Sequence, residues 1–166
     1  MNLRNYKDNR ENHKKKYIPK KYHTPEKIGE KWQLDVKYVP KNCYVGKIPD
    51  KFYQYTVIDE ATRERYIFAF KEQSSHSTVK FIEMAIKYFG YKPKEIQTDN
   101  GFEFTYFRDT KRIHSFDKFC IINGIKHKLI KPRTPRHNGK VERSHRNDNE
   151  RFYKNLKFYS LKDLNY

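Results

Sequence analysis

The sequence predicts one α/β domain in which helices pack on a mixed β-sheet. The chain has 166 residues, a length that suits a single compact domain. Its first ordered segments alternate apolar and polar residues, as half-buried strands do, and the later part alternates between strand and helix patterns. An antiparallel start followed by alternating helices and strands favours a mixed sheet covered by helices.

The strand pattern begins at Trp32. The segment 32–39 (WQLDVKYV) alternates apolar and polar residues, and the next two segments are rich in aromatic and β-branched residues, which favour strands. The link of four residues at 59–62 is short enough to predict an antiparallel hairpin between them. The predicted strands are 32–39, 52–59, 65–71, 94–98 and 125–130.

The segment 75–89 changes to helical spacing. Val79, Ile82, Ile86 and Phe89 recur on one face. Gly90 is a natural end, and Ser74 or Ser75 is a plausible N-cap. Two further helices are predicted at 115–123 and 139–155.

The charge balance favours a polyanionic partner. There are 37 Lys and Arg against 20 Asp and Glu, a net charge of +17. Such an excess is typical of nucleic-acid binding and, less often, of binding to an anionic membrane. The sequence has no long apolar run, so we expect DNA as partner and no membrane.

Composition also predicts how the chain is organised. Residues 1–30 are basic and poor in apolar residues, which predicts an extended tail or linker; a solvated linker and a basic arm lying on DNA are both open. We expect a core at 31–159 and a C-terminal end at 160–166, where the chain could be truncated. The two cysteines, Cys43 and Cys120, show no zinc-site spacing and suit a reduced, cytoplasmic setting. We also expect a bacterial protein associated with the nucleoid.

Three acidic residues stand in distinctive contexts: Asp35 in WQLDVKYV, Asp99 in IQTDNGFEF and Glu142 in TPRHNGKVERSHR. Asp35 should point away from the core side chains of its strand, Asp99 should follow a strand end, and Glu142 should lie in the first turn of a helix. They can meet only if the first and fourth strands are neighbours and the last helix crosses them. Each acid also has a local explanation as a strand, turn or helix-start residue. The combination favours a site for a hard divalent cation.

These motifs resemble the D-D-E catalytic core of insertion-sequence transposases and retroviral-type integrases. The resemblance runs from about Trp32 to Tyr159, and its most specific part is Pro135–Arg146. It implies a ribonuclease-H-like fold with a five-stranded mixed sheet. It also implies a divalent-metal-dependent polynucleotidyl transferase, with Asp35, Asp99 and Glu142 as catalytic metal ligands for two Mg²⁺ ions, which Mn²⁺ could replace. The function so implied is cleavage of DNA ends and strand transfer, by a homo-oligomer that brings two ends together.

Two features depart from the family pattern. Asp99 and Glu142 are 43 positions apart, more than in many members, and the excess is expected in an inserted loop at 105–114. Residues before the core are also too few and too polar for a helix-turn-helix. A nuclease of the same fold that does not join strands, and an inactive DNA-binding remnant, are therefore alternatives.

A basic stretch surrounds Glu142, with eight Lys and Arg from Lys126 to Arg146. It suits a channel for phosphates. Arg146 and Asn149 should share the helix face of Glu142, although an ordinary solvated face would show the same spacing. The predicted DNA-contacting residues are Lys131, Arg133, Arg136, His137, Asn138, Lys140, Arg143, Arg146 and Asn149.

Overall fold

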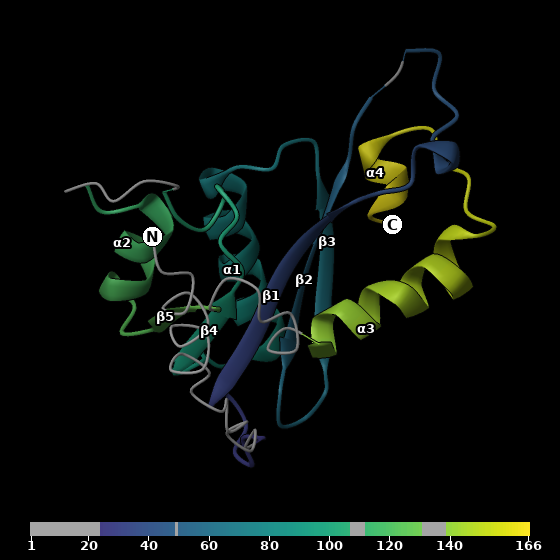
Figure 1. Ribbon diagram of the computed structural model, residues 1–166. Helices are drawn as coiled ribbons and strands as arrows, with labels where there is room; N and C mark the ends of the chain where they lie inside the picture. Colours follow the sequence, from purple (N-terminus) through teal and green to yellow (C-terminus); the bar gives the residue numbers. More distant parts are fainter. Residues whose placement is uncertain (1–23, 49, 107–111, 131–138) are drawn as a thin grey trace, which may run out of the picture.

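A five-stranded mixed sheet forms the centre of the molecule, with helices on both faces (Figure 1). The computed structural model describes residues 24–48, 50–106, 112–130 and 139–166. The strand order is β3-β2-β1-β4-β5; β1 pairs antiparallel with β2 and parallel with β4. The first and fourth strands are therefore neighbours, as the acidic motifs required. The strands are β1 (Lys31–Tyr38), β2 (Tyr53–Asp59), β3 (Arg65–Phe70), β4 (Glu95–Thr98) and β5 (Lys126–Leu129).

The five predicted strands are all present, with boundaries within one residue of the predictions. The predicted helix 75–89 is confirmed, and the second predicted helix ends one residue early. The predicted helix 139–155 is wrong in its second half, which is a π-helix at Asp148–Tyr153. The helices are α1 (Ser75–Phe89), α2 (Ser115–Ile122), α3 (Gly139–Asn147) and α4 (Leu161–Leu164), with a short 3-10 helix at Lys41–Cys43.

A shared contact with Gln54 accounts for the π-helix. The Gln54 amide donates to Asp148 Oδ2 at 2.8 Å, and the Tyr153 hydroxyl donates to Gln54 Oε1 at 2.5 Å. The two residues are five positions apart, which an α-helix turns to different sides. A π-helix closes its hydrogen bonds five residues apart and so brings both side chains to one strand residue. The local sequence carries no sign of this long-range contact.

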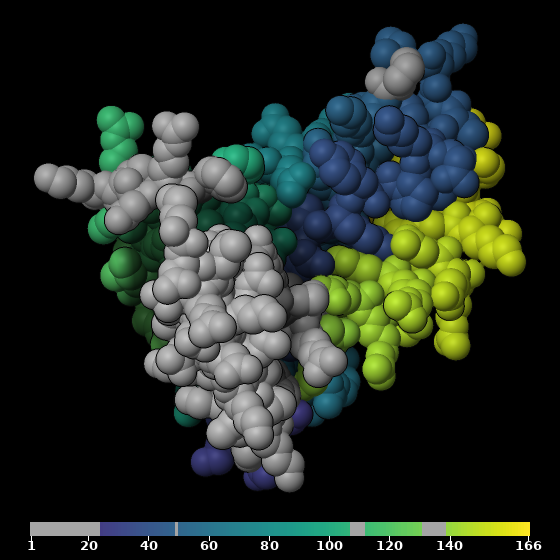
Figure 2. All heavy atoms as spheres, in the orientation of Figure 1, coloured from purple at the N-terminus to yellow at the C-terminus, as the bar shows by residue number. Residues whose placement is uncertain are grey.

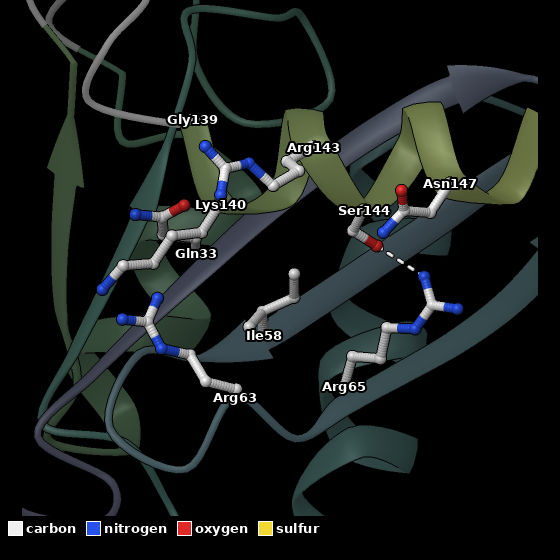
Figure 3. A pocket seen from close by; sticks show the side chains of 9 residues that line it. All are labelled: Gln33, Ile58, Arg63, Arg65, Gly139, Lys140, Arg143, Ser144 and Asn147. Atoms are coloured by element: carbon white, nitrogen blue, oxygen red, sulfur yellow. Dashed lines mark hydrogen bonds between the residues drawn. The ribbon is translucent and has the colours of Figure 1, made fainter.

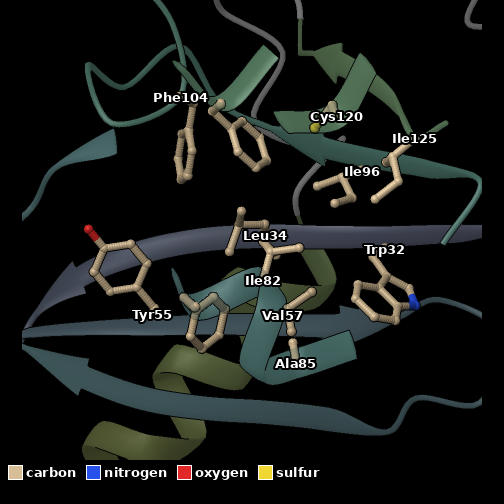
Figure 4. Close-up of a cluster of buried hydrophobic side chains, with 12 residues drawn as sticks. Trp32, Leu34, Tyr55, Val57, Ile82, Ala85, Ile96, Phe104, Cys120 and Ile125 are labelled. Atoms are coloured by element: carbon tan, nitrogen blue, oxygen red, sulfur yellow. The ribbon is translucent and has the colours of Figure 1, made fainter. Parts of the chain in front are cut away.

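Alternation along β1 and β2 divides the sheet into two faces. Trp32 and Leu34 point to one face, where they pack with side chains of α1 and α2 in the main core (Figure 4). Gln33, Asp35 and Lys37 point to the other face, beneath α3. The polar face of the central strand thus lies under the helix that carries Glu142.

The described C-terminal residues pack against the segment around the 3-10 helix (blue in Figure 2) and against β3. Phe158 is buried with Cys43 and Phe52 in a second, smaller cluster, and the Asn165 side chain exchanges hydrogen bonds with the backbone of Ala69 on β3. Both cysteines are free and buried. Within the described ranges, no helix combines the length and apolar character needed to cross a membrane.

The N-cap of α1 gives a first test of the fold. Ser74, not Ser75, is the cap: its hydroxyl accepts from Ser77 N at 3.2 Å. We expect Ser74→Ala to lower the free energy of unfolding by about 1 kcal/mol, because that N–H loses its acceptor. In thermal unfolding this corresponds to a fall in Tm of about 3 °C for a domain of this size. Ser75→Ala is the matched control, and an equal loss there would contradict the assignment.

Candidate active site

Asp35 lies in the middle of β1 on the face covered by α3. Its side chain is 17% exposed. One carboxylate oxygen accepts from Val36 N at 2.9 Å, and the other lies 3.4 Å from His145 Nδ1. Burial, followed by the positive charge of Lys37, lowers the pKa of His145 to about 4. The imidazole is therefore neutral near neutral pH, and the contact with Asp35 is not an ion pair there.

The other two predicted acids approach Asp35 from separate elements. Asp99 directly follows β4, where its carboxylate accepts from Gly101 N at 2.9 Å in a turn. Glu142 is exposed in the first turn of α3. Burial raises the pKa of Asp35 to about 7, with further contributions from the negative charges of Asp99, Glu142 and Glu103. Asp99 and Glu142 are thus close enough to Asp35 for their charges to act on it.

This donor set fits a divalent cation in its chemistry. Carboxylate oxygens are the ligands that Mg²⁺ prefers, and a cation would offset the repulsion that raises the pKa of Asp35. Among the described residues, no three Asp, Glu, His or Cys side chains are grouped tightly enough to hold an ion as they stand.

A partly buried chain of polar side chains supports the end of β4 beside Asp99. Thr98 Oγ1 lies 2.9 Å from His127 Nε2, and His127 Nδ1 lies 2.5 Å from Asp117 Oδ1. Burial lowers the pKa of His127, which favours the neutral ring. The Thr98 hydroxyl donates to the backbone oxygen of Asp99 at 2.8 Å, so the chain reaches the predicted catalytic residue itself. The chain ties together β4, β5 and α2 next to the predicted catalytic residue.

The start of α3 is fixed by an acid that the sequence assigned only to a turn. The Glu60 side chain is fully buried and pairs with Lys140 at 2.6 Å and with Lys31 at 3.0 Å. It also accepts from the Gln33 amide at 2.9 Å. Lys140 is two residues before Glu142, so these contacts set the position of the Glu142 turn. Glu60 and its partners are distant in sequence, and no local pattern indicates this role.

Comparison with protein families decides the classification. The model of the integrase core domain matches residues 25–135, about two thirds of the chain, and a second integrase core domain model matches residues 123–166. This chain belongs to the integrase core domain family. The resemblance drawn from the three acidic motifs is therefore confirmed.

Two relatives show the range of proteins that share this integrase core. "Putative integrase ORF3" of Spiroplasma virus SpV1-C74 is 34% identical over 125 residues, which cover 69% of the chain and 34% of the relative. A retrovirus-related Pol polyprotein from transposon TNT 1-94 of Nicotiana tabacum is 33% identical over 96 residues, covering 57% of the chain and 7% of the relative. The chain thus spans about a third or less of these relatives.

Solved structures confirm the predicted ribonuclease-H-like fold. The simian T-cell lymphotropic virus intasome, in complex with PP2A regulatory subunit B56 gamma, aligns with a TM-score of 0.67 at 22% identity, covering 82% of this chain and 46% of that chain. The HTLV-2 integrase catalytic core domain, in complex with magnesium in a dimeric form, aligns with a TM-score of 0.55 at 26% identity, covering 74% and 69%.

Only some of the predicted DNA-contacting residues of the integrase core can be located. Arg143 and Arg146 are exposed on α3. Lys140 is held by Glu60, and Asn149, in the π-helix, accepts from Lys37 Nζ at 3.0 Å. The structure leaves their roles as DNA contacts a prediction. The predicted residues outside the described ranges are Lys131, Arg133, Arg136, His137 and Asn138.

Proposed function

We propose that this integrase core cleaves DNA ends and transfers the strands to target DNA in a metal-dependent reaction. The observation that carries the proposal is that Asp99, after β4, and Glu142, on α3, lie near enough to Asp35 on β1 for their negative charges to raise its pKa. Membership of the integrase core domain family supports DNA integration or transposition as the general activity. Element ends and target DNA are the proposed substrates.

Asp35, Asp99 and Glu142 are the residues that would hold the metal. Two Mg²⁺ ions, or Mn²⁺ in their place, would supply charge stabilisation for the attacking and leaving oxygens of an in-line displacement at a phosphodiester. A magnesium complex of the HTLV-2 core domain supports this choice of ion.

The chain's own contribution is to place these carboxylates and the DNA. β1 fixes Asp35 on the α3 face, the Thr98–His127–Asp117 chain supports the β4 end, and the pair of Glu60 with Lys140 fixes the start of α3. The basic surface would bind the phosphate backbone. The intasome and the dimeric core among the similar structures support the proposal that this core acts as an oligomer on DNA.

The test is cleavage and joining on a labelled branched DNA that mimics the strand-transfer product. Wild type, Asp99→Asn and Glu142→Gln are compared in Mg²⁺, in Mn²⁺ and in chelator. We expect metal-dependent joining by the wild type only. Glu83→Gln, an exposed acid on α1, is the matched control and should retain activity.

Other outcomes separate the alternatives. Metal-dependent nicking without joining would favour a nuclease on the same fold. DNA binding without chemistry in either metal would favour an inactive remnant. Full activity in both acidic variants would contradict the assignment of the site.

A further inference from the structure

A cavity of about 830 Å³ lies between α3 and the β2–β3 hairpin (Figure 3). Gln33 and Ile58 from the sheet contribute to its lining. Its charged lining residues are all cations, and none of the predicted catalytic acids lines it. The four cations are Arg63, Arg65, Lys140 and Arg143.

Two of the four cations are already paired with acids of the protein. Lys140 pairs with Glu60, as described above. Arg65 lies 2.7 Å from Asp148 and donates to Ser144 Oγ at 2.5 Å. These two pairs hold the cavity wall in place.

The other two cations are not neutralised. Within the described part of the chain, no ion pair or hydrogen bond involves the guanidinium group of Arg63 or Arg143. Figure 3 shows that both extend toward the Lys140 end of the cavity, Arg63 from the hairpin and Arg143 from α3. Two unpaired guanidinium groups at one end of a cavity repel each other unless an anion lies between them.

The backbone of Arg63 gives independent support for a ligand here. Arg63 has a φ of 66° and is the one non-glycine residue with positive φ among the described residues. That left-handed conformation is unfavourable for a side chain such as arginine, and residues held in it cluster at ligand sites. The strain positions a cation beside the cavity at a place where glycine would fit the turn better.

The chemistry of the guanidinium group indicates which ligand the cavity would take. Guanidinium groups bind phosphate oxygens through paired, charge-assisted hydrogen bonds. We propose that the cavity is a second phosphate-binding site, which holds backbone phosphates of a DNA strand between Arg63 and Arg143. The site lies on the β2–β3 side of α3, whereas Asp35 and His145 meet beneath that helix. The choice of DNA as the source of the phosphates rests on the proposed function.

The test measures DNA binding in chelator, so that no catalytic metal or chemistry contributes. A fluorescein-labelled branched DNA is titrated with the full chain over a series of KCl concentrations. The test variant combines Arg63→Gly, which also relieves the strained φ, with Arg143→Gln on an exposed helix position. The control combines Lys80→Gln with Lys87→Gln, which removes the same two charges from exposed positions of α1.

Each phosphate contact contributes about 0.9 to the steepness of the plot of log K against log salt. Loss of two contacts should therefore reduce the magnitude of this slope by about 1.8. At about 0.1 M salt this corresponds to binding that is weaker on the order of 60-fold. The control should change the slope by far less. Thermal unfolding of the test variant should show a Tm no lower than that of the wild type.

Three results would overturn the inference. They are an unchanged slope in the test variant, an equal change in the control, and the absence of DNA binding by the wild type. Tripolyphosphate is the probe for free phosphate compounds: if it stabilises the wild type alone while DNA binding is equal in both, the site takes a small polyphosphate and not DNA. Weakened DNA binding by the variant together with an inactive wild type would retain the site and reject the proposed chemistry.

Discussion

Asp59→Ala is expected to lower the free energy of unfolding by about 4 kcal/mol. The Asp59 side chain is fully buried at the end of β2, and its carboxylate joins three distant segments. Without it, several buried donors would have no acceptor, and each such group costs about 1–3 kcal/mol. The five donors to this carboxylate are Gly29 N, Trp32 Nε1, Tyr91 Oη, Ala61 N and Thr62 N.

Urea unfolding measures this effect. With a typical dependence of about 2 kcal/mol per M urea, the midpoint should fall by about 2 M. Asp59→Asn keeps the size of the side chain and one acceptor oxygen, so its midpoint should lie between those of Asp59→Ala and the wild type. Asp50→Ala, at a surface pair with Lys71, is the matched control and should leave the midpoint unchanged. Equal midpoints for Asp59→Ala and the wild type would show that these hydrogen bonds do not stabilise the fold.

The buried hydrogen bonds of Asp59 could not be predicted from the sequence. The sequence placed Asp59 and Glu60 in a hairpin turn, and Asp59 does accept from the turn residues Ala61 and Thr62. An acidic pair in a turn usually faces solvent. Here both side chains are buried, because partners at least 27 positions away, Trp32 and Gln33 among them, supply their hydrogen bonds. Such contacts follow from the tertiary fold and leave no local pattern.

The strands were predictable because apolar and polar residues alternate along a strand that is buried on one face. Along β1, Leu34 is fully buried whereas Asp35 lies on the opposite face, as the apolar–polar pattern indicated. The parallel pairing of β1 with β4 could be inferred only by requiring the acidic motifs to meet. At the end of the predicted inserted loop 105–114, His114 is the N-cap of α2, and its Nδ1 accepts from Phe116 N at 3.2 Å. The loop residues 107–111 lie outside the described ranges.

In the candidate site, too, the sequence predicted some residues and not others. Asp35, Asp99 and Glu142 could be chosen from sequence because each stands in a recognisable motif. Their neighbours could not. Lys37 donates to the backbone of His145 at 3.1 Å and so connects β1 to α3, yet in the sequence it is one of many lysines. His145 follows Glu142 by three positions, and this helical spacing was the available sign that the two share a side of α3.

Asp35→Asn is expected to reduce strand joining by about a thousandfold or more, because loss of metal-based charge stabilisation costs several kcal/mol. The same substitution should stabilise the protein in chelator at pH 8. Burial and the charges of Asp99, Glu142 and Glu103 raise the pKa of Asp35 to about 7, so its carboxylate is ionised at pH 8 at a cost to the folded state. This cost is absent at a pH below the pKa that Asp35 has in the unfolded chain, and it is fully present above the pKa that Asp35 has in the folded protein. Asparagine has the same shape and no charge, and it can still accept from Val36 N.

Without metal, we expect Asp35→Asn to raise the free energy of unfolding by about 2 kcal/mol and the Tm by about 5 °C. This gain is smaller than the whole pKa shift would give, because Asp35 keeps some contact with solvent. Mg²⁺ should then reverse the order. It should raise the Tm of the wild type by binding the folded state, and raise that of Asp35→Asn much less. Glu83→Gln should behave as the wild type does in chelator and in Mg²⁺. Equal stabilisation of wild type and Asp35→Asn by Mg²⁺ would exclude Asp35 as a ligand, whereas a selective loss would establish metal binding at this carboxylate without reference to activity.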